Sequence, residues 1–178
     1  MALPSPSSRQ LVGRVVADTV APRLKALGYR RSGMTWRKPA GEVVRIVQVQ
    51  RSRGNTARAS RFTINLGVYH AAFHLARTGR QLDGPITEPA CGLRARIGRF
   101  LNGSDVWYTV RTSADVPRIG DELASILDRQ ALPWLESFEA LADLHRAFLD
   151  DNRAFDAAVA AFVLGLDTVP DLIELAIQ

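Results

Sequence analysis

Hydrophobic side chains recur at three- and four-residue spacing through residues 11–27, which is the period of an amphipathic helix. Ser7 or Ser8 can cap the start of this helix, and Gly28 suits the left-handed position that ends one. Pro22 lacks an amide hydrogen and interrupts the stripe. We therefore expect either a kink around this proline or a second helix with Pro22 in its first turn.

Strand-like patterns follow. Residues 61–69 alternate strictly, with apolar side chains on one parity and mostly polar side chains on the other. β-Branched residues are typical of strands, and the preceding segment, residues 42–53, is rich in them. Further strands are predicted at residues 29–38, which form a hairpin around Ser32 and Gly33, at residues 42–53 and at residues 106–111.

The two longest predicted strands, residues 42–53 and 61–69, favour one pairing register. If paired residue numbers sum to an odd value near 113, Val47 and Val49 lie on the apolar face of residues 61–69. An even sum would turn glutamines into the apolar layer, at a cost of about 1 to 3 kcal/mol for each unpaired polar group. The odd register gives the sheet a second, polar face, formed by Gln48, Gln50, Thr63, Asn65 and Tyr69, with Ile46 as its apolar member.

Helical patterns dominate the rest of the chain. Residues 93–101 place apolar side chains on one helical face, whereas residues 76–90 have the composition of an irregular surface connection. Beyond Pro117 we expect helices at residues 118–130, 133–149 and 152–164, and a last turn near 170–177. This order predicts an α+β fold, in which an N-terminal helix packs on an antiparallel sheet of about 4–5 strands and C-terminal helices follow.

Several of these segments together resemble a bacterial family, the domain-of-unknown-function family numbered 4304. The resemblance covers residues 10–140, and it rests on "LKALGYRRSGMTWRK", "VVRIVQVQRSR" and "RFTINLGVY", and more weakly on "CGLRARIG", "DVWYTV" and "ALPWLESF". It implies an α+β fold in a bacterial cytoplasmic protein. It implies no activity and supplies no catalytic residues.

The composition is that of a globular protein, with 47% hydrophobic and 23% charged residues. We expect one α+β domain over residues 1–178, with a flexible N-terminus at residues 1–6 and a helical extension at residues 150–178. The longest apolar run, residues 157–166, is about half the roughly 20 residues of a membrane-spanning helix, so no membrane partner is expected. With a single cysteine, Cys91, and no secretory signal pattern, the chain is expected to be cytoplasmic.

Charge divides the chain. Residues 1–111 hold 19 Lys and Arg against 5 Asp and Glu, a net charge of +14, whereas residues 112–178 hold 4 against 13, a net charge of −9. A basic half favours an anionic partner. The alternative is that the acidic helices lie against the basic residues and neutralise them.

Candidates for chemistry are few. Cys91 precedes a predicted helix and lies near arginines, which would activate a thiol, but an inert buried cysteine is the alternative. His70 and His74 have the spacing of paired metal ligands on a helix, yet two ligands do not complete a site. No phosphate loop, serine nucleophile motif or carboxylate pair appears. We therefore predict no catalytic, cofactor-binding or metal-binding residues, and no cofactor.

Arginine is the most prominent polar residue type in the basic half. It could neutralise phosphates, and Tyr69, Trp36 and Trp107 could add stacking if they reach the same surface. The arginines with this potential are Arg45, Arg51, Arg53, Arg58, Arg61, Arg94, Arg96 and Arg99.

The sequence favours a non-catalytic module that binds a macromolecule, with a protein as the first partner and nucleic acid as the alternative. The polar sheet face could receive the partner or could simply contact water. An enzyme is the third reading, and the oligomeric state stays open. The predicted partner-binding residues are Gln48, Gln50, Thr63, Asn65, Tyr69, Arg45, Arg51, Arg61, Arg94 and Arg96.

Overall fold

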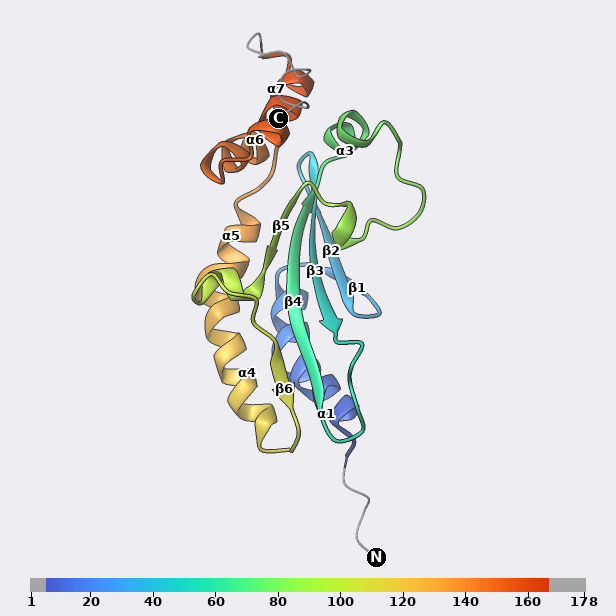
Figure 1. The fold of residues 1–178 in the computed structure, drawn as a ribbon, viewed down its shortest axis with the longest axis vertical. Coiled ribbons are helices and arrows are strands. Elements are labelled where there is room, and N and C mark those ends of the chain that lie inside the picture. Colours follow the sequence, from blue (N-terminus) through green and yellow to red (C-terminus); the bar gives the residue numbers. More distant parts are fainter. Residues whose placement is uncertain (1–5, 167–178) are drawn as a thin grey trace, which may run out of the picture. The chain divides into compact units, whose positions relative to one another are not determined.

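A computed structural model describes residues 6–166 of the 178-residue chain (Figure 1). The turn predicted near residues 170–177 lies outside these residues, and so does the predicted flexible N-terminus, residues 1–6, apart from residue 6. The helices are α1 (Ser8–Val15), α2 (Ala21–Ala26), α3 (Ala71–Thr78), α4 (Asp115–Ile126), α5 (Leu132–Glu136), α6 (Leu141–Asp150) and α7 (Ala154–Val163). Shorter turns are the π-helical η1 (Val16–Val20) and η4 (Leu127–Ala131) and the 3-10 helical η2 (Glu88–Ala90) and η3 (Ile97–Phe100).

The strands form one sheet in the order β1-β2-β3-β4-β5, and a sixth strand pairs with β4. They are β1 (Arg30–Ser32), β2 (Thr35–Ala40), β3 (Val43–Arg51), β4 (Ser60–Tyr69), β5 (Leu93–Arg96) and β6 (Tyr108–Val110). Strand β6 runs antiparallel to β4, with Arg61 opposite Thr109. The predicted α+β fold, with an N-terminal helix, an antiparallel sheet and C-terminal helices, is confirmed, with six strands in place of four or five.

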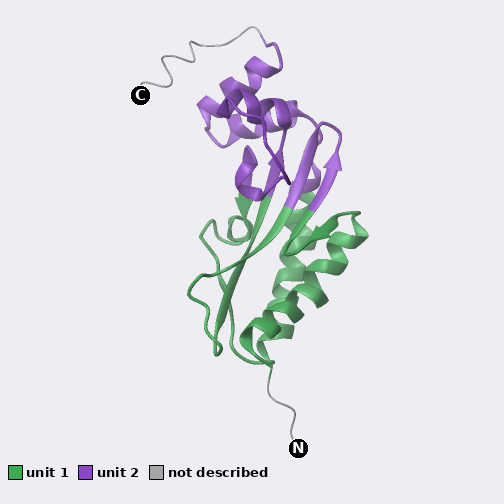
Figure 2. Cartoon of the chain, turned by 90° about the vertical axis from the view of Figure 1, so that its right-hand side faces the viewer, with its two compact units in different colours: residues 1–36, 47–66, 95–133 green, residues 37–46, 67–94, 134–178 purple. Residues whose placement is uncertain are grey.

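Contacts divide the chain into two compact units, coloured separately in Figure 2. Unit 1 consists of residues 1–36, 47–66 and 95–133, and unit 2 consists of residues 37–46, 67–94 and 134–178. In unit 1, α1 and the π-helical turn η1 pack against α4. In unit 2, α7 packs against α3 and α6. Strands β2 to β5 each contribute residues to both units.

The N-terminal helix follows its sequence signals. The Ser7 side chain accepts from the Gln10 amide, and Gln10 in turn accepts from the Ser7 amide at 2.7 Å, which is a capping box. The π-helical turn η1 joins α1 to α2, and Pro22 lies in the first turn of α2. The backbone therefore stays helical through η1 without an interruption, and Pro22 takes the first-turn position that one of the two alternatives predicted. Gly28 then ends it with φ of 85°.

The predicted strand register is also confirmed. The Ser52 amide donates to the Arg61 carbonyl at 2.9 Å, a pair whose residue numbers sum to 113. The apolar face predicted from this register is buried, since Val47, Val49, Phe62, Ile64 and Leu66 are each 3% exposed or less. The polar face of the sheet therefore holds the side chains that parity assigned to it.

Three predicted elements were wrong. Residues 93–101 form β5 and η3 rather than a helix, because Leu93 and Ala95 alternate into the core as a strand requires. Helix α3 occupies part of the segment predicted as irregular; it ends at Gly79, which has φ of 69°. The helix predicted at residues 133–149 is broken between α5 and α6, because buried Arg45 binds carbonyl groups in the break.

The other predicted helices form near their expected positions. Helix α4 begins at Asp115, with Pro117 in its first turn, and α7 covers most of residues 152–164. No helix within residues 6–166 is long and apolar enough to cross a membrane.

Candidate functional site

The middle of the polar sheet face is buried. Thr63 is 0% exposed and Asn65 is 4% exposed. The Thr63 hydroxyl donates to the Val106 carbonyl at 2.8 Å, so the chain just before β6 contacts β4 at this position. Both side chains find their hydrogen-bond partners inside unit 1. From the sequence, both were predicted to contact a partner, but in the structure both are buried.

A network of polar side chains extends from Asn65 across the face. The Asn65 amide donates to Gln50 Oε1 at 2.7 Å, and Asn65 Oδ1 accepts from Arg96 Nε at 3.1 Å. Arg96 also forms an ion pair with Asp105. Trp107 and Arg61 adjoin this network. We call the whole group the Trp107 cluster; it consists of Gln50, Arg61, Asn65, Arg96, Asp105 and Trp107.

Trp107 lies beside two guanidinium groups. The Cζ atoms of Arg61 and Arg96 are 5.7 and 5.6 Å from the centre of the Trp107 ring, within cation–π range. The indole Nε1 donates to Asp105 Oδ2 at 3.2 Å. Hydrogen bonds from Arg96 and Trp107 hold the pKa of Asp105 below its usual value, so it is charged at neutral pH.

The outer members of the cluster are accessible. Arg61 is exposed, and Gln50, Arg96 and Trp107 are half-buried. Two buried residues of β4 support them: Asn65, a member of the cluster, holds Arg96, and Thr63, which lies outside it, holds the chain beside Trp107. Unit 1 therefore presents an aromatic ring with two oriented guanidinium groups.

Other predicted residues are not members of this cluster. Tyr69, 7% exposed, packs with Ile46 and Cys91 in the interior of unit 2, and burial raises its pKa. Gln48 is half-buried. Arg94 is exposed in unit 2, where it forms a bidentate ion pair with Glu88 at 2.6 and 3.0 Å.

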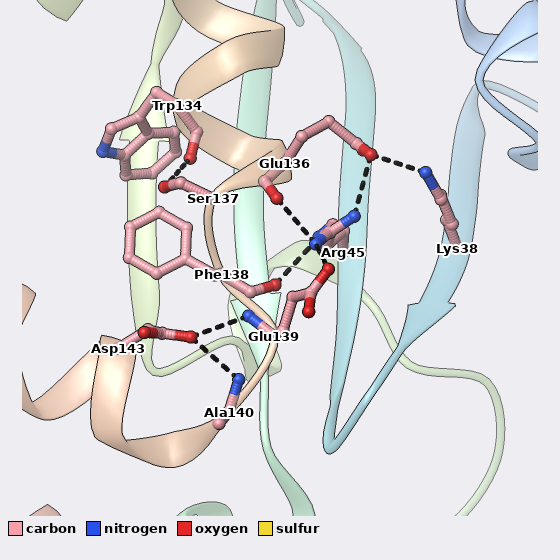
Figure 3. Close-up of polar contacts among 9 residues, drawn as sticks. All are labelled: Lys38, Arg45, Trp134, Glu136, Ser137, Phe138, Glu139, Ala140 and Asp143. Atoms are coloured by element: carbon pink, nitrogen blue, oxygen red, sulfur yellow. Dashed lines mark hydrogen bonds and ion pairs between the residues drawn. The ribbon is translucent and has the colours of Figure 1, made fainter.

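Arg45 does not belong to a binding surface. Its residue number gives it the parity of Val47 and Val49, and its side chain is 3% exposed. It donates to the Phe138 carbonyl at 2.9 Å, the Glu136 carbonyl at 2.7 Å and Glu136 Oε2 at 2.8 Å (Figure 3). Arg45 therefore fixes the connection between α5 and α6 and is unavailable to a partner.

Cys91 is a core residue. It follows the 3-10 turn η2 instead of preceding a helix, so the activation predicted from a helix N-terminus is absent. The side chain is 1% exposed, and its Sγ lies 3.7 Å from the Thr87 carbonyl. Burial raises the pKa of the thiol and Glu88 raises it further, whereas two nearby arginines lower it less.

We expect the native protein to react with the thiol reagent DTNB far more slowly than the urea-unfolded chain, because Cys91 is buried and protonated. Stopped-flow absorbance with and without urea measures the two rates. Equal rates in the folded and unfolded protein would contradict the buried, inert thiol.

The two histidines of the HxxxH spacing have separate structural contacts. His70 caps α3, its Nδ1 accepting from the Phe73 amide at 3.2 Å, and burial lowers its pKa. His74 Nδ1 lies 3.2 Å from the Ala90 carbonyl. Within residues 6–166, no group of three or more His, Cys, Asp and Glu could hold a metal ion.

Charge separates by unit. Unit 1 contains 15 Lys and Arg against 6 Asp and Glu, whereas unit 2 contains 8 against 12. Five of the six acidic residues of unit 1 lie on η1, α4 and η4, which leaves Asp105 as the one acidic residue on the rest of that unit. The hairpin loop between β3 and β4 adds two exposed arginines, Arg53 and Arg58.

Acidic residues of the later helices do pair with basic residues from the first part of the chain. Arg23 contacts Asp128 in unit 1 at 2.9 Å. In unit 2, Glu136 pairs with Lys38 and Arg45, and Asp156 with Arg77. This neutralisation does not extend to Arg53, Arg58 and Arg61, which form no ion pair with a carboxylate among the described residues.

The comparison with protein families places the chain. A family model described as Domain of unknown function (DUF4304) matches residues 20–137. The chain belongs to this family. The DUF4304 match contains the whole sheet and the Trp107 cluster, and it ends before α6 and α7. No curated protein and no solved structure matches the chain at a significant level.

Asp105 was not singled out in the sequence analysis. One signal was available: Asp105 is the only acidic residue between Glu88 and Asp115, in a stretch that contains three arginines and Arg111. An isolated carboxylate two residues before a tryptophan in a basic segment is a candidate for fixing that ring.

Proposed function

We propose that this DUF4304 domain is a non-catalytic binding module and that unit 1 binds single-stranded nucleic acid. The observation that supports this most is the exposed basic surface around Trp107, where the ring lies within cation–π range of Arg61 and Arg96. The excess of nine positive charges on unit 1 supports it further.

The Trp107 cluster fits the chemistry of a single strand. Unpaired bases stack on aromatic rings and on guanidinium planes, and Trp107 and its two arginines supply both kinds of surface. Arg53 and Arg58, on the loop of the same hairpin that carries Arg61, supply charges for the phosphates. Arg61 and the two loop arginines thus come from the β3–β4 hairpin, whereas Arg96 comes from β5 and Trp107 directly precedes β6.

A protein partner is the second candidate. Tryptophan and arginine are also the residue types that dominate protein–protein contacts, and this favours such a partner for the same cluster. Recognition through the whole polar sheet face is less favoured than the sequence suggested, because Thr63, Asn65 and Tyr69 are buried.

Two variants separate stacking from charge in one binding experiment. Trp107→Leu is expected to weaken binding of a labelled single-stranded 12-mer by about 1–3 kcal/mol with little change in salt dependence. Arg53→Ala with Arg58→Ala should instead reduce the slope of log K against log salt by about 1.4, since each phosphate contact contributes roughly 0.7 for a single strand. Fluorescence anisotropy at several salt concentrations measures both effects.

The control removes the same charge from unit 2. Arg80→Ala with Arg146→Ala eliminates two exposed arginines there and should leave affinity and slope nearly unchanged. Absence of binding by the wild-type protein even at low salt would overturn the nucleic-acid proposal. Equal losses in the unit 1 and unit 2 variants would show that any contact is non-specific attraction and not the surface proposed.

A further inference from the structure

Arg51, at the end of β3, has an unusual environment. Its Nε is buried and makes no hydrogen bond among the described residues. The one other buried side-chain atom of this kind in residues 6–166 is Asp156 Oδ1, which has an ion pair with Arg77 at 3.1 Å. Buried polar groups are normally paired, so an orphaned Arg51 Nε indicates a missing acceptor.

A second arginine lies close to the first. The Ser8 hydroxyl donates to the Thr56 carbonyl at 2.8 Å and lies 2.9 Å from the Ser60 hydroxyl, which ties the first turn of α1 to the β3–β4 hairpin. Arg9, the next residue of α1, is thereby brought to the end of the hairpin. The hydrogen bonds of Ser8 carry this placement, and burial together with the positive charge of Arg9 lowers the pKa of Arg51, in agreement with it.

No carboxylate compensates these charges. Neither Arg9 nor Arg51 forms an ion pair within residues 6–166, and the adjoining loop adds the exposed Arg53 and Arg58. Two neighbouring guanidinium groups with an unused buried donor repel each other in the absence of an anion. A tetrahedral oxyanion would offset the repulsion, and it would satisfy that donor once the Arg51 side chain turns its Nε, which has almost no accessible surface, toward the anion.

We propose that Arg9 and Arg51 form a binding site for one phosphate group. Arg51 would donate through Nε and a terminal nitrogen to two phosphate oxygens, the parallel arrangement that guanidinium and phosphate favour, and Arg9 would supply the second positive charge. Assigning this phosphate to a nucleic-acid backbone rests on the proposed function; a free phosphate presents the same oxyanion.

NMR of the ¹⁵N-labelled full-length protein tests the site directly. The Nε–H resonance of Arg51, assigned by its loss in Arg51→Lys, should shift saturably with inorganic phosphate at constant ionic strength and not with chloride. Arg9→Ala should weaken this binding by about tenfold or more, as expected for the loss of a charge-assisted contact. Arg14→Ala removes an exposed arginine from the same helix and should have no effect.

A second titration with the single-stranded 12-mer identifies the source of the phosphate. A shift of the Arg51 resonance with both ligands supports a backbone phosphate at the site. A shift with phosphate alone supports the site and contradicts its part in nucleic-acid binding. Oligonucleotide binding without any Arg51 shift in either titration would overturn the site and leave the proposed function standing. An unchanged affinity in Arg9→Ala would also overturn the two-arginine site.

Discussion

Replacing Arg45 by alanine is expected to lower the free energy of unfolding by about 3–5 kcal/mol. The substitution deprives the carbonyls of Glu136 and Phe138 of a charged donor and removes a buried stem from unit 2. Each lost hydrogen bond to a charged group costs about 1.5–3 kcal/mol. The Arg45 side chain is 3% exposed, so water does not readily take the place of the guanidinium. Urea denaturation followed by far-UV circular dichroism measures the change.

Two further variants show which part of the Arg45 interaction matters. Lys38→Ala removes the other cation at Glu136, but both side chains of that pair are about a quarter exposed, so a loss of at most about 1 kcal/mol is expected. Arg45→Lys keeps the charge and loses the forked geometry, and its stability should lie between those of the other variants. Arg45→Ala with wild-type stability would contradict the structural role of Arg45.

The Arg45 interaction explains why one helix prediction failed. The stretch "PWLESFEALADLHRAF" has a continuous helical period, and nothing local in it requires a break. The break between α5 and α6 is set by Arg45, some 90 residues earlier in the chain, which binds carbonyls that a continuous helix would use internally. Periodicity describes only neighbours in sequence, so it could not contain this long-range contact.

The polar sheet face shows what parity can and cannot predict. Parity gave the correct register and the side chains on each face, because a one-residue slip would have buried glutamines. It could not show what covers a face. Thr63 is met by Val106, just before β6. The stretch "LRARIGRFL", which forms β5 and η3, has the apolar spacing of a helix as well as of the strand and turn that form.

The sequence predicted a division of charge along the chain, but not which basic residues are buried and which are exposed. The division at residue 111 was real in the sequence, yet the structure distributes the basic residues between the two units, and even residues of one strand, such as Arg45 and Arg51, fall in different units. Arg45 and Arg61 illustrate this, since the first is a buried structural cation and the second an exposed member of the Trp107 cluster. Residue type alone did not distinguish them.

Gly98→Ala is expected to destabilise the protein by about 3 kcal/mol. Gly98 lies in η3, and a Cβ there would overlap the Ser104 carbonyl oxygen and approach the Val106 amide nitrogen to 2.8 Å. Both obstacles are backbone atoms and cannot rotate away. The chain that would have to move contains Val106, the acceptor for Thr63, and leads directly to Trp107.

The Gly98→Ala substitution should therefore also reduce binding of the single-stranded 12-mer, because it displaces the chain that positions the Trp107 ring. Gly13→Ala is the matched control: nothing lies within 4 Å of the position of its Cβ in α1, so the change should stabilise the protein by about 0.5–1 kcal/mol and leave binding intact. Urea denaturation and anisotropy on both variants give the two readouts. Equal stability of the two variants would show that the chain between η3 and β6 can yield without cost, and would contradict the close approach of that chain to Gly98.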